Sequence, residues 1–145
     1  MNLATNRKAN FEYHIIEEFC AGIVLVGSEV KSIRSGNVTL NDSFIYLKDG
    51  GVWIKNLKVS QYSQSHSMEK HNEYRDKKLL LTKKQIQKIS KELSTSGITC
   101  IPLSVITKKN KIKINIAIVK GKKNWDKRQS IKDRDIKREL QRNSY

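Results

Sequence analysis

The chain has 145 residues, a mass of 16.8 kDa and 37% hydrophobic side chains, which suits one domain with a modest core. Its 29 Lys and Arg against 14 Asp and Glu give a net charge of +15, which points to a polyanionic partner and argues against a neutral metabolic enzyme. The longest apolar stretch, near residues 20–26, is far shorter than the roughly 20 residues of a membrane-spanning helix, and residues 1–8 lack the apolar run of a secretory signal. We therefore expect a cytoplasmic protein without membrane contact.

Residues 11–19 alternate apolar and polar side chains and lead into the apolar residues 23–26, so the pattern predicts strands over both segments. A short helix is predicted over 28–34, because Ser28 is a suitable N-cap, an acidic residue lies in the first turn and Gly36 can end the helix.

Two apolar-alternating runs, 38–47 and 52–59, are separated by Asp49-Gly50-Gly51. Asp-Gly is a strong hairpin signal, since both residues of such a turn need positive φ. The sequence therefore predicts a β-hairpin here. Residues 61–78 are polar and show no period, which predicts a long loop or an irregular helix.

The main helix is predicted to follow Thr82, because Thr82 and Gln85 have the spacing of a capping box and apolar residues then recur every three or four positions before Gly97. Residues 98–107 and 111–119 predict a second pair of strands, with Pro102 at an edge or bulge.

In the last strand, Ile112, Ile114, Ile116 and Ile118 alternate with Lys111, Lys113, Asn115 and Ala117, so we expect one buried face and one lysine-bearing face. Taken together, these elements predict a mainly β fold: a small closed antiparallel barrel that resembles the oligonucleotide-binding barrels, with short helices packed outside.

The basic charge is concentrated toward the C-terminus. Residues 108–145 carry 14 basic and 4 acidic side chains, and residues 108–123 hold seven lysines and no acid. Residues 124–145 mix both signs and contain neither Gly nor Pro. We expect an RNA-binding domain over 1–123 and a basic tail over 124–145 that is disordered alone and becomes helical against RNA.

Signatures of catalysis are weak. Gly121-Lys122 lacks the other residues of a phosphate-binding loop, and His66, Glu69 and His71 lie in a polar segment without the spacing of a metal site. A metal-dependent RNA-processing enzyme built on these three residues stays the least favoured alternative.

Cys20 and Cys100 are too far apart for a local redox or metal motif, and we expect both to be buried. No enzyme, metal or cofactor is predicted.

Trp125 follows Lys120, Lys122 and Lys123, at the point where the chain leaves the last predicted strand. An exposed tryptophan among cations is a stacking platform for bases, whereas a buried one would cover the end of the barrel. Both interpretations are open from this pattern alone.

Several segments resemble the family of SsrA-binding proteins, also called small protein B. They are Asn6-Arg-Lys-Ala-Asn-Phe-Glu-Tyr13, Glu29-Val-Lys-Ser-Ile-Arg-Ser-Gly36, Asp42-Ser43, Lys78-Leu-Leu-Leu81 and Lys120-Gly-Lys-Lys-Asn-Trp-Asp-Lys-Arg128. The resemblance covers residues 6–132 in order. It implies an oligonucleotide-binding-type barrel that holds the tRNA-like domain of transfer-messenger RNA and accompanies it into stalled ribosomes, where trans-translation tags and releases the nascent peptide.

The resemblance also implies individual roles. RNA contacts fall on Cys20, Leu80 and Lys113, although many relatives carry glutamate at the position of Cys20, and a thiol is a poor acceptor. Trp125 stands where relatives often have His or Tyr, which favours stacking. The tail is expected to contact the decoding site and message channel of the small ribosomal subunit. The resemblance places the motif Asp126-Lys127-Arg128 beside the decoding site. Beyond Lys132 the resemblance is too loose to assign single residues, and we expect Lys132, Arg134, Lys137 and Arg138 to contact the ribosome as the basic residues of the tail.

We therefore predict a monomeric, non-enzymatic RNA-binding adaptor for ribosome rescue. The alternative is a basic ribosomal or cold-shock-like RNA-binding protein, which would share the charge and the barrel.

Overall fold

The computed structural model describes residues 2–61 and 72–122. Within these ranges the chain forms nine strands and three helices. The strands are β1 (Asn2–Thr5), β2 (Tyr13–Ile23), β3 (Val38–Thr39), β4 (Phe44–Lys48), β5 (Gly51–Lys55), β6 (Lys58–Val59), β7 (Lys77–Leu80), β8 (Ile98–Lys108) and β9 (Lys111–Gly121). The helices are α1 (Ala9–Glu12), α2 (Gly27–Arg34) and α3 (Lys83–Leu93).

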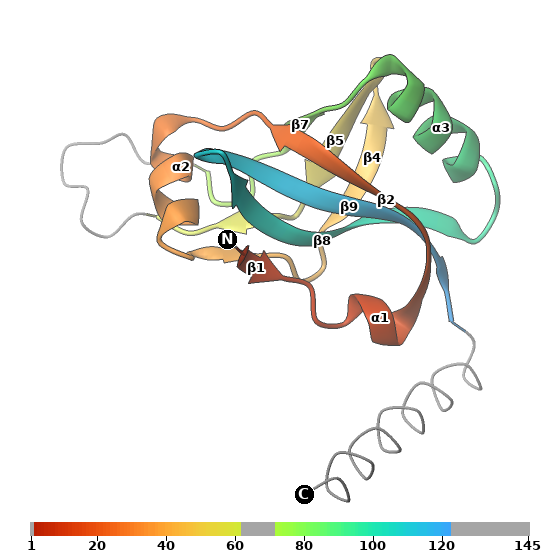
Figure 1. The fold of residues 1–145 in the computed structure, drawn as a ribbon, viewed down its shortest axis with the longest axis horizontal. Coiled ribbons are helices and arrows are strands. Elements are labelled where there is room, and N and C mark those ends of the chain that lie inside the picture. The colour runs from red at the N-terminus through yellow and green to blue at the C-terminus, as the bar shows by residue number, and fades with distance from the viewer. Residues whose placement is uncertain (1, 62–71, 123–145) are drawn as a thin grey trace, which may run out of the picture.

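The described part of the chain is mainly β, as predicted. Seven strands form an antiparallel sheet in the order β1-β8-β4-β5-β7-β2-β9, and β8 also pairs with β9. The strands β3 and β6 form a separate two-stranded sheet. Figure 1 shows α2 and α3 at opposite ends of the large sheet, with the long strands β2, β8 and β9 running between them.

Both predicted hairpins are confirmed. In the β4–β5 hairpin, Asp49 and Gly50 have φ of 51° and 72°, the conformation that an Asp-Gly turn supplies at little cost. In the β8–β9 hairpin, Lys109 and Asn110 have φ of 51° and 62°. The register of β8 shifts just after Pro102, which confirms the predicted bulge.

The inner face of the sheet carries the core. Ile114, Ile116 and Ile118 are fully buried, as their alternation predicts, and each contributes roughly 1.5–3 kcal/mol by leaving water. Cys100 is buried beside them, and burial raises the pKa of its thiol to about 12. Cys20 is exposed, so the expectation that both cysteines are buried is wrong for Cys20.

The outer face of β9 is only partly open to solvent. Helix α1 brings Ala9 against Ile101, Ala117 and Val119, and all four residues are buried in a second apolar cluster. The prediction of a lysine-bearing outer face therefore holds near Lys113 and fails for the last part of the strand.

The start of β2 also differs from the prediction. Residues 9–12 are helical, so the strand begins at Tyr13, and residues 24–26 lie beyond its end at Ile23. Helix α2 begins at Gly27 with Val26 as N-cap, and Ser28 is buried inside its first turn. The carboxylate of Glu29 replaces the predicted cap, because its Oε1 accepts a hydrogen bond of 2.9 Å from the Val26 N–H.

Two predicted runs are each divided into two short strands. Asp42 and Asn56, each with φ of 63°, interrupt the runs 38–47 and 52–59. The predicted loop 61–78 is also too long, because Lys77 and the residue after it already belong to β7.

The capping box of α3 is confirmed. Thr82 Oγ1 accepts from the Gln85 N–H at 3.2 Å, and Gln85 Oε1 accepts from the Thr82 N–H at 3.0 Å. Gly97, with φ of 83°, lies in the turn that leads from α3 into β8.

Candidate nucleic-acid interface

Two of the RNA-contact residues that the family resemblance implies, Leu80 and Lys113, lie on either side of one glycine. Leu80 of β7 is opposite Gly22 of β2, and Gly22 is opposite Lys113 of β9. Residues directly opposite in a sheet point to the same face, and adjacent strands are about 4.8 Å apart. Leu80 and Lys113 therefore share the outer face at a separation of about 10 Å.

Gly22 allows the close packing at the centre of this row. A Cβ at Gly22 would lie 3.1 Å from Leu80 Cβ and 3.4 Å from Leu80 Cδ1. The Leu80 side chain thus lies across the backbone of β2, yet 57% of Leu80 remains exposed to solvent. Leu80 thus presents an apolar side chain to solvent on the same face as the charge of Lys113.

A groove of about 390 Å³ runs along this row. Leu80, Leu25 and Ile112 supply apolar walls, and Lys113 and Arg34 supply positive charge. Arg34 Nη2 donates to the Asn110 carbonyl at 3.0 Å, which joins α2 to the β8–β9 turn at the border of the groove. Apolar walls with cations at the rim suit a nucleotide, because the base has an apolar face and the phosphate a negative charge.

Cys20 lies on the same outer face but lines a different hollow, of about 470 Å³. It is opposite Asn115 of β9, whose Nδ2 donates to Ser104 Oγ at 3.0 Å. The structure thus places Cys20 beside a polar row of side chains and separates it from the groove at Leu80 and Lys113.

Lys120 and Lys122, which were also predicted to contact RNA, do not lie in the groove with Lys113. Lys120 lies seven positions further along β9, so its side chain points to the opposite face of the strand. Lys122 Nζ donates to the Asn10 carbonyl at 2.7 Å, and its N–H donates to the Glu12 carbonyl at 2.8 Å. Lys122 therefore ties the end of β9 to α1.

The other predicted contact residues lie outside the described residues. They are Lys123, Trp125, Asp126, Lys127, Arg128, Lys132, Arg134, Lys137 and Arg138.

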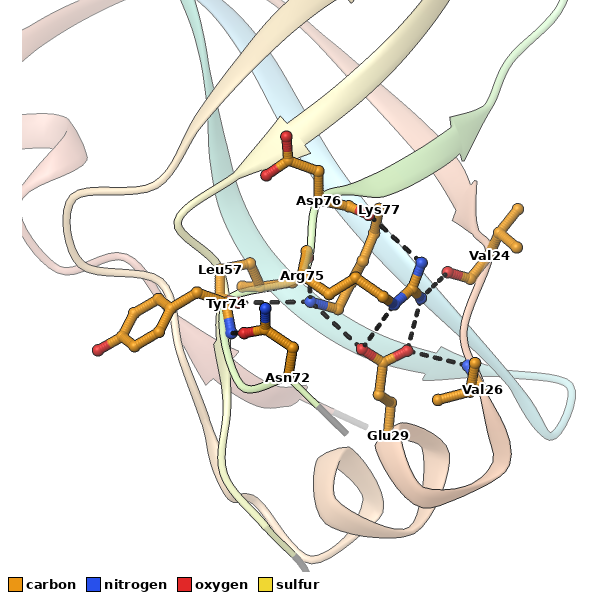
Figure 2. A network of polar contacts seen from close by, with 9 residues as sticks. All are labelled: Val24, Val26, Glu29, Leu57, Asn72, Tyr74, Arg75, Asp76 and Lys77. Atoms are coloured by element: carbon orange, nitrogen blue, oxygen red, sulfur yellow. Dashed lines mark hydrogen bonds and ion pairs between the residues drawn. The ribbon is translucent and has the colours of Figure 1, made fainter. Parts of the chain in front are cut away.

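A buried ionic network supports the strands that form the groove (Figure 2). Glu29 of α2 accepts from Arg75 Nη2 at 2.6 Å, and its Oε2 lies 3.5 Å from Lys77 Nζ. Arg75 Nη2 also donates to the Val24 carbonyl at 3.2 Å. The network thus links the segment after β2 to the segment that enters β7, and these strands carry Gly22 and Leu80.

The charges of this network shift the pKa values of its members. Burial alone would raise the pKa of Glu29, but the hydrogen bonds from Arg75 and the Val26 N–H, with the charges of Lys77 and Arg75, hold it below its usual range. Burial lowers the pKa of Lys77, partly offset by the charge of Glu29. Lys77 Nζ also donates to the Arg75 carbonyl at 2.7 Å, so this buried ammonium is hydrogen-bonded.

Sequence reasoning missed this network apart from the acidic residue in the first turn of α2, because Arg75 and Lys77 are 46 or more positions away from Glu29. Among the described residues, no group of three or more His, Cys, Asp or Glu side chains could hold a metal ion. His66, Glu69 and His71 lie outside the described residues. None of the described helices is long and apolar enough to cross a membrane.

Comparison with known proteins identifies the family. The family model described as SmpB protein matches residues 3–145. The chain belongs to the SmpB protein family. It is 47% identical to the SsrA-binding protein of Persephonella marina over 138 residues, which covers 95% of this chain and 90% of that protein. It is also 47% identical to the SsrA-binding protein of Anaplasma marginale (strain Florida), over 97% of this chain and 94% of that protein.

A solved structure of the family has the same fold. It is described as "tmRNA-SmpB: a journey to the center of the bacterial ribosome", and it superposes with a TM-score of 0.70 at 33% identity. The match covers 83% of this chain and 85% of the solved one. The resemblance on which the sequence interpretation rested is therefore confirmed.

Proposed function

We propose that the protein is an RNA-binding adaptor that binds the tRNA-like domain of transfer-messenger RNA and delivers it to stalled ribosomes for trans-translation. The observation that carries the proposal is the match to SsrA-binding proteins at 47% identity over 95% of the chain. The fold shared with the solved tmRNA-SmpB structure supports the same partners, the RNA and the ribosome. An adaptor of this kind acts in the cytoplasm by binding, and needs no catalytic group of its own.

The RNA contacts are proposed for the outer face of the sheet. The groove at Leu80 and Lys113 would take a nucleotide, and Cys20 would contribute a weaker contact beside Asn115. Lys120 would add charge from the other face of β9, and Lys122 would add it only by leaving its contacts with α1. The proposed ribosome contacts are those of the tail, from Asp126 to Arg138.

We also infer that the sheet closes into a barrel of the oligonucleotide-binding type. Support comes from β8, which pairs with β4 and with β9, so that the series β8-β4-β5-β7-β2-β9 returns to its first strand. Closure of this kind removes exposed sheet edges and gives a rigid surface for RNA.

Sequencing the RNA that co-purifies with the affinity-tagged protein tests the proposed function. Transfer-messenger RNA should be the most enriched species, and the protein should be present at far less than one copy per ribosome. Stoichiometric recovery with all ribosomes, without enrichment of transfer-messenger RNA, would instead identify a basic ribosomal protein.

A further inference from the structure

A second part of the outer face carries aromatic and basic side chains that the groove does not use. It is formed by β4, β5 and β7, where Phe44 is opposite Lys55, Tyr46 is opposite Trp53, and Trp53 is opposite Lys78. We call it the aromatic–lysine face; its members are Phe44, Tyr46, Lys48, Trp53, Lys55 and Lys78.

These aromatic rings are not needed to fill the core. Ile45, Val52 and Ile54 alternate with them and occupy the inner face, where all three are buried. Phe44 is 39% exposed, and its ring centroid lies 6.4 Å from that of Tyr46. Tyr46 and Trp53 are half-buried. Aromatic side chains that stay partly exposed beside lysines are typical of proteins that stack unpaired bases.

Trp53 offers a hydrogen-bond donor without a partner. Its Nε1 is buried and makes no hydrogen bond in the described residues. A Cβ at Gly51 would lie 3.5 Å from Trp53 Nε1 and 3.3 Å from Lys78 Cε, so the indole edge and the lysine chain meet over this glycine. If the exposed Lys78 side chain moves, the indole N–H of Trp53 becomes accessible beside the Lys78 ammonium group. These two donors together suit an anionic oxygen such as that of a phosphate.

The carboxylate that contacts this face, that of Asp76, already has a partner. Tyr46 Oη donates to Asp76 Oδ2 at 2.7 Å, and this hydrogen bond, with burial and the carboxylate charge, raises the pKa of Tyr46 to about 12. Tyr46 thus keeps its proton and a neutral ring at physiological pH, and three exposed lysines dominate the charge of the face.

The aromatic–lysine face is continuous with the groove. Lys78 and Leu80 are two residues apart on β7 and point to the same outer side, and Leu80 borders the groove. We propose that the aromatic–lysine face binds unpaired nucleotides of the same RNA that occupies the groove, with bases against Phe44 and Trp53 and phosphates against the lysines. This inference rests on the proposed function for the identity of the RNA.

Trp53 provides a direct probe, since the chain has two tryptophans and Trp125→Phe leaves Trp53 as the only one. Titration of this variant with the tRNA-like domain should quench Trp53 fluorescence with the same midpoint as an independent filter-binding curve. Phe44→Ala and the double variant Lys55→Glu/Lys78→Glu should each weaken RNA binding by about tenfold, in line with the loss of one stacked base or two phosphate contacts. Lys91→Glu, the same charge reversal at an exposed position of α3, should stay within about twofold.

The expected folding control is an unchanged circular dichroism spectrum for the lysine variants, because their side chains are exposed. Normal RNA binding without any change in Trp53 fluorescence, or normal binding by the folded lysine double variant, would overturn the inference and leave the proposed function intact. If the wild-type chain does not bind the tRNA-like domain at all, the proposed function itself is wrong.

Discussion

Lys113 places its charge in the groove beside Gly22, with Leu80 on the other side of this glycine. Lys111 lies two residues earlier on the same face, so like charges repel in the free protein. An RNA phosphate relieves this repulsion and releases counterions when it binds. At the scale of single residues, we expect RNA affinity to be mainly electrostatic, with Leu80 setting the position of the nucleotide.

The salt dependence of Lys113→Glu tests this expectation. Neutralisation of about four to six phosphates by the wild-type chain predicts a log–log slope of roughly −3 to −5 for RNA affinity against salt concentration. Lys113→Glu should weaken binding and make the slope shallower by about 1, whereas Lys91→Glu should change neither quantity measurably. A filter-binding series across salt concentrations measures both, and an affinity independent of salt would refute the electrostatic explanation.

The juxtaposition of Leu80 and Lys113 could not be derived from their own sequence context. Both residues were identified through the family resemblance, and only the strand register shows that they meet across Gly22. The exposure of Cys20 was missed for a related reason, since its apolar neighbours in the sequence point to the opposite face of β2.

At the scale of elements, Glu29 holds α2 to the ends of β2 and β7 through a cluster of charges. Its side chain has no exposed surface, whereas 35% of the Arg75 side chain is exposed. Removal of one partner from a buried ionic cluster leaves the others without compensation, which costs more than the loss of a surface ion pair.

Glu29→Gln should therefore lower the free energy of unfolding by about 3 kcal/mol at neutral pH, measured by urea denaturation. Lys77→Met should cost less, because Glu29 keeps its hydrogen bonds with Arg75 and Val26, and the methionine fits an apolar site. The control Glu18→Gln, at an exposed position of β2, should change stability by less than about 0.5 kcal/mol.

The stability lost in Glu29→Gln should also depend on pH. The pKa of Glu29 is lower in the folded state than in the unfolded state, where it is about 4.3. The carboxylate therefore contributes its full stabilisation of the fold above the unfolded pKa, and this stabilisation is lost as the pH falls through the folded pKa. The difference in unfolding free energy between wild type and Glu29→Gln should therefore be constant above about pH 5 and narrow as the pH is lowered from about 5 to about 3. A constant difference over this range would contradict the assigned role of the carboxylate.

The sequence patterns correctly predicted a hairpin turn and a helix cap that are stabilised by residues close to one another in the chain. The Asp49-Gly50 turn and the capping box of Thr82 and Gln85 depend on residues close in sequence, and both are confirmed. Strand β7 was missed because it begins with Lys77, a residue that hydropathy places at the surface and that Glu29 stabilises in the interior. Helix α1 was missed because its four residues are held by packing of Ala9 against β8 and β9 rather than by helix propensity.

At the scale of the whole molecule, the described domain and the charged tail have separate roles in our account. The apolar faces of all nine described strands lie before Lys123, and we therefore propose that this domain folds without residues 124–145. The groove and the aromatic–lysine face also lie entirely within the described domain. We propose that this domain holds the RNA and that the tail acts on the ribosome.

A chain that ends at Lys123 tests this division most directly, with peptide tagging on ribosomes stalled at the end of a message without a stop codon as the readout. The truncated chain should keep its thermal midpoint and still bind the tRNA-like domain, weakened by less than about tenfold through the loss of Trp125 and the tail cations. Full-length protein should support tagging, and the truncated chain should not. Normal tagging by the truncated chain would contradict the account, as would the loss of RNA binding together with tagging.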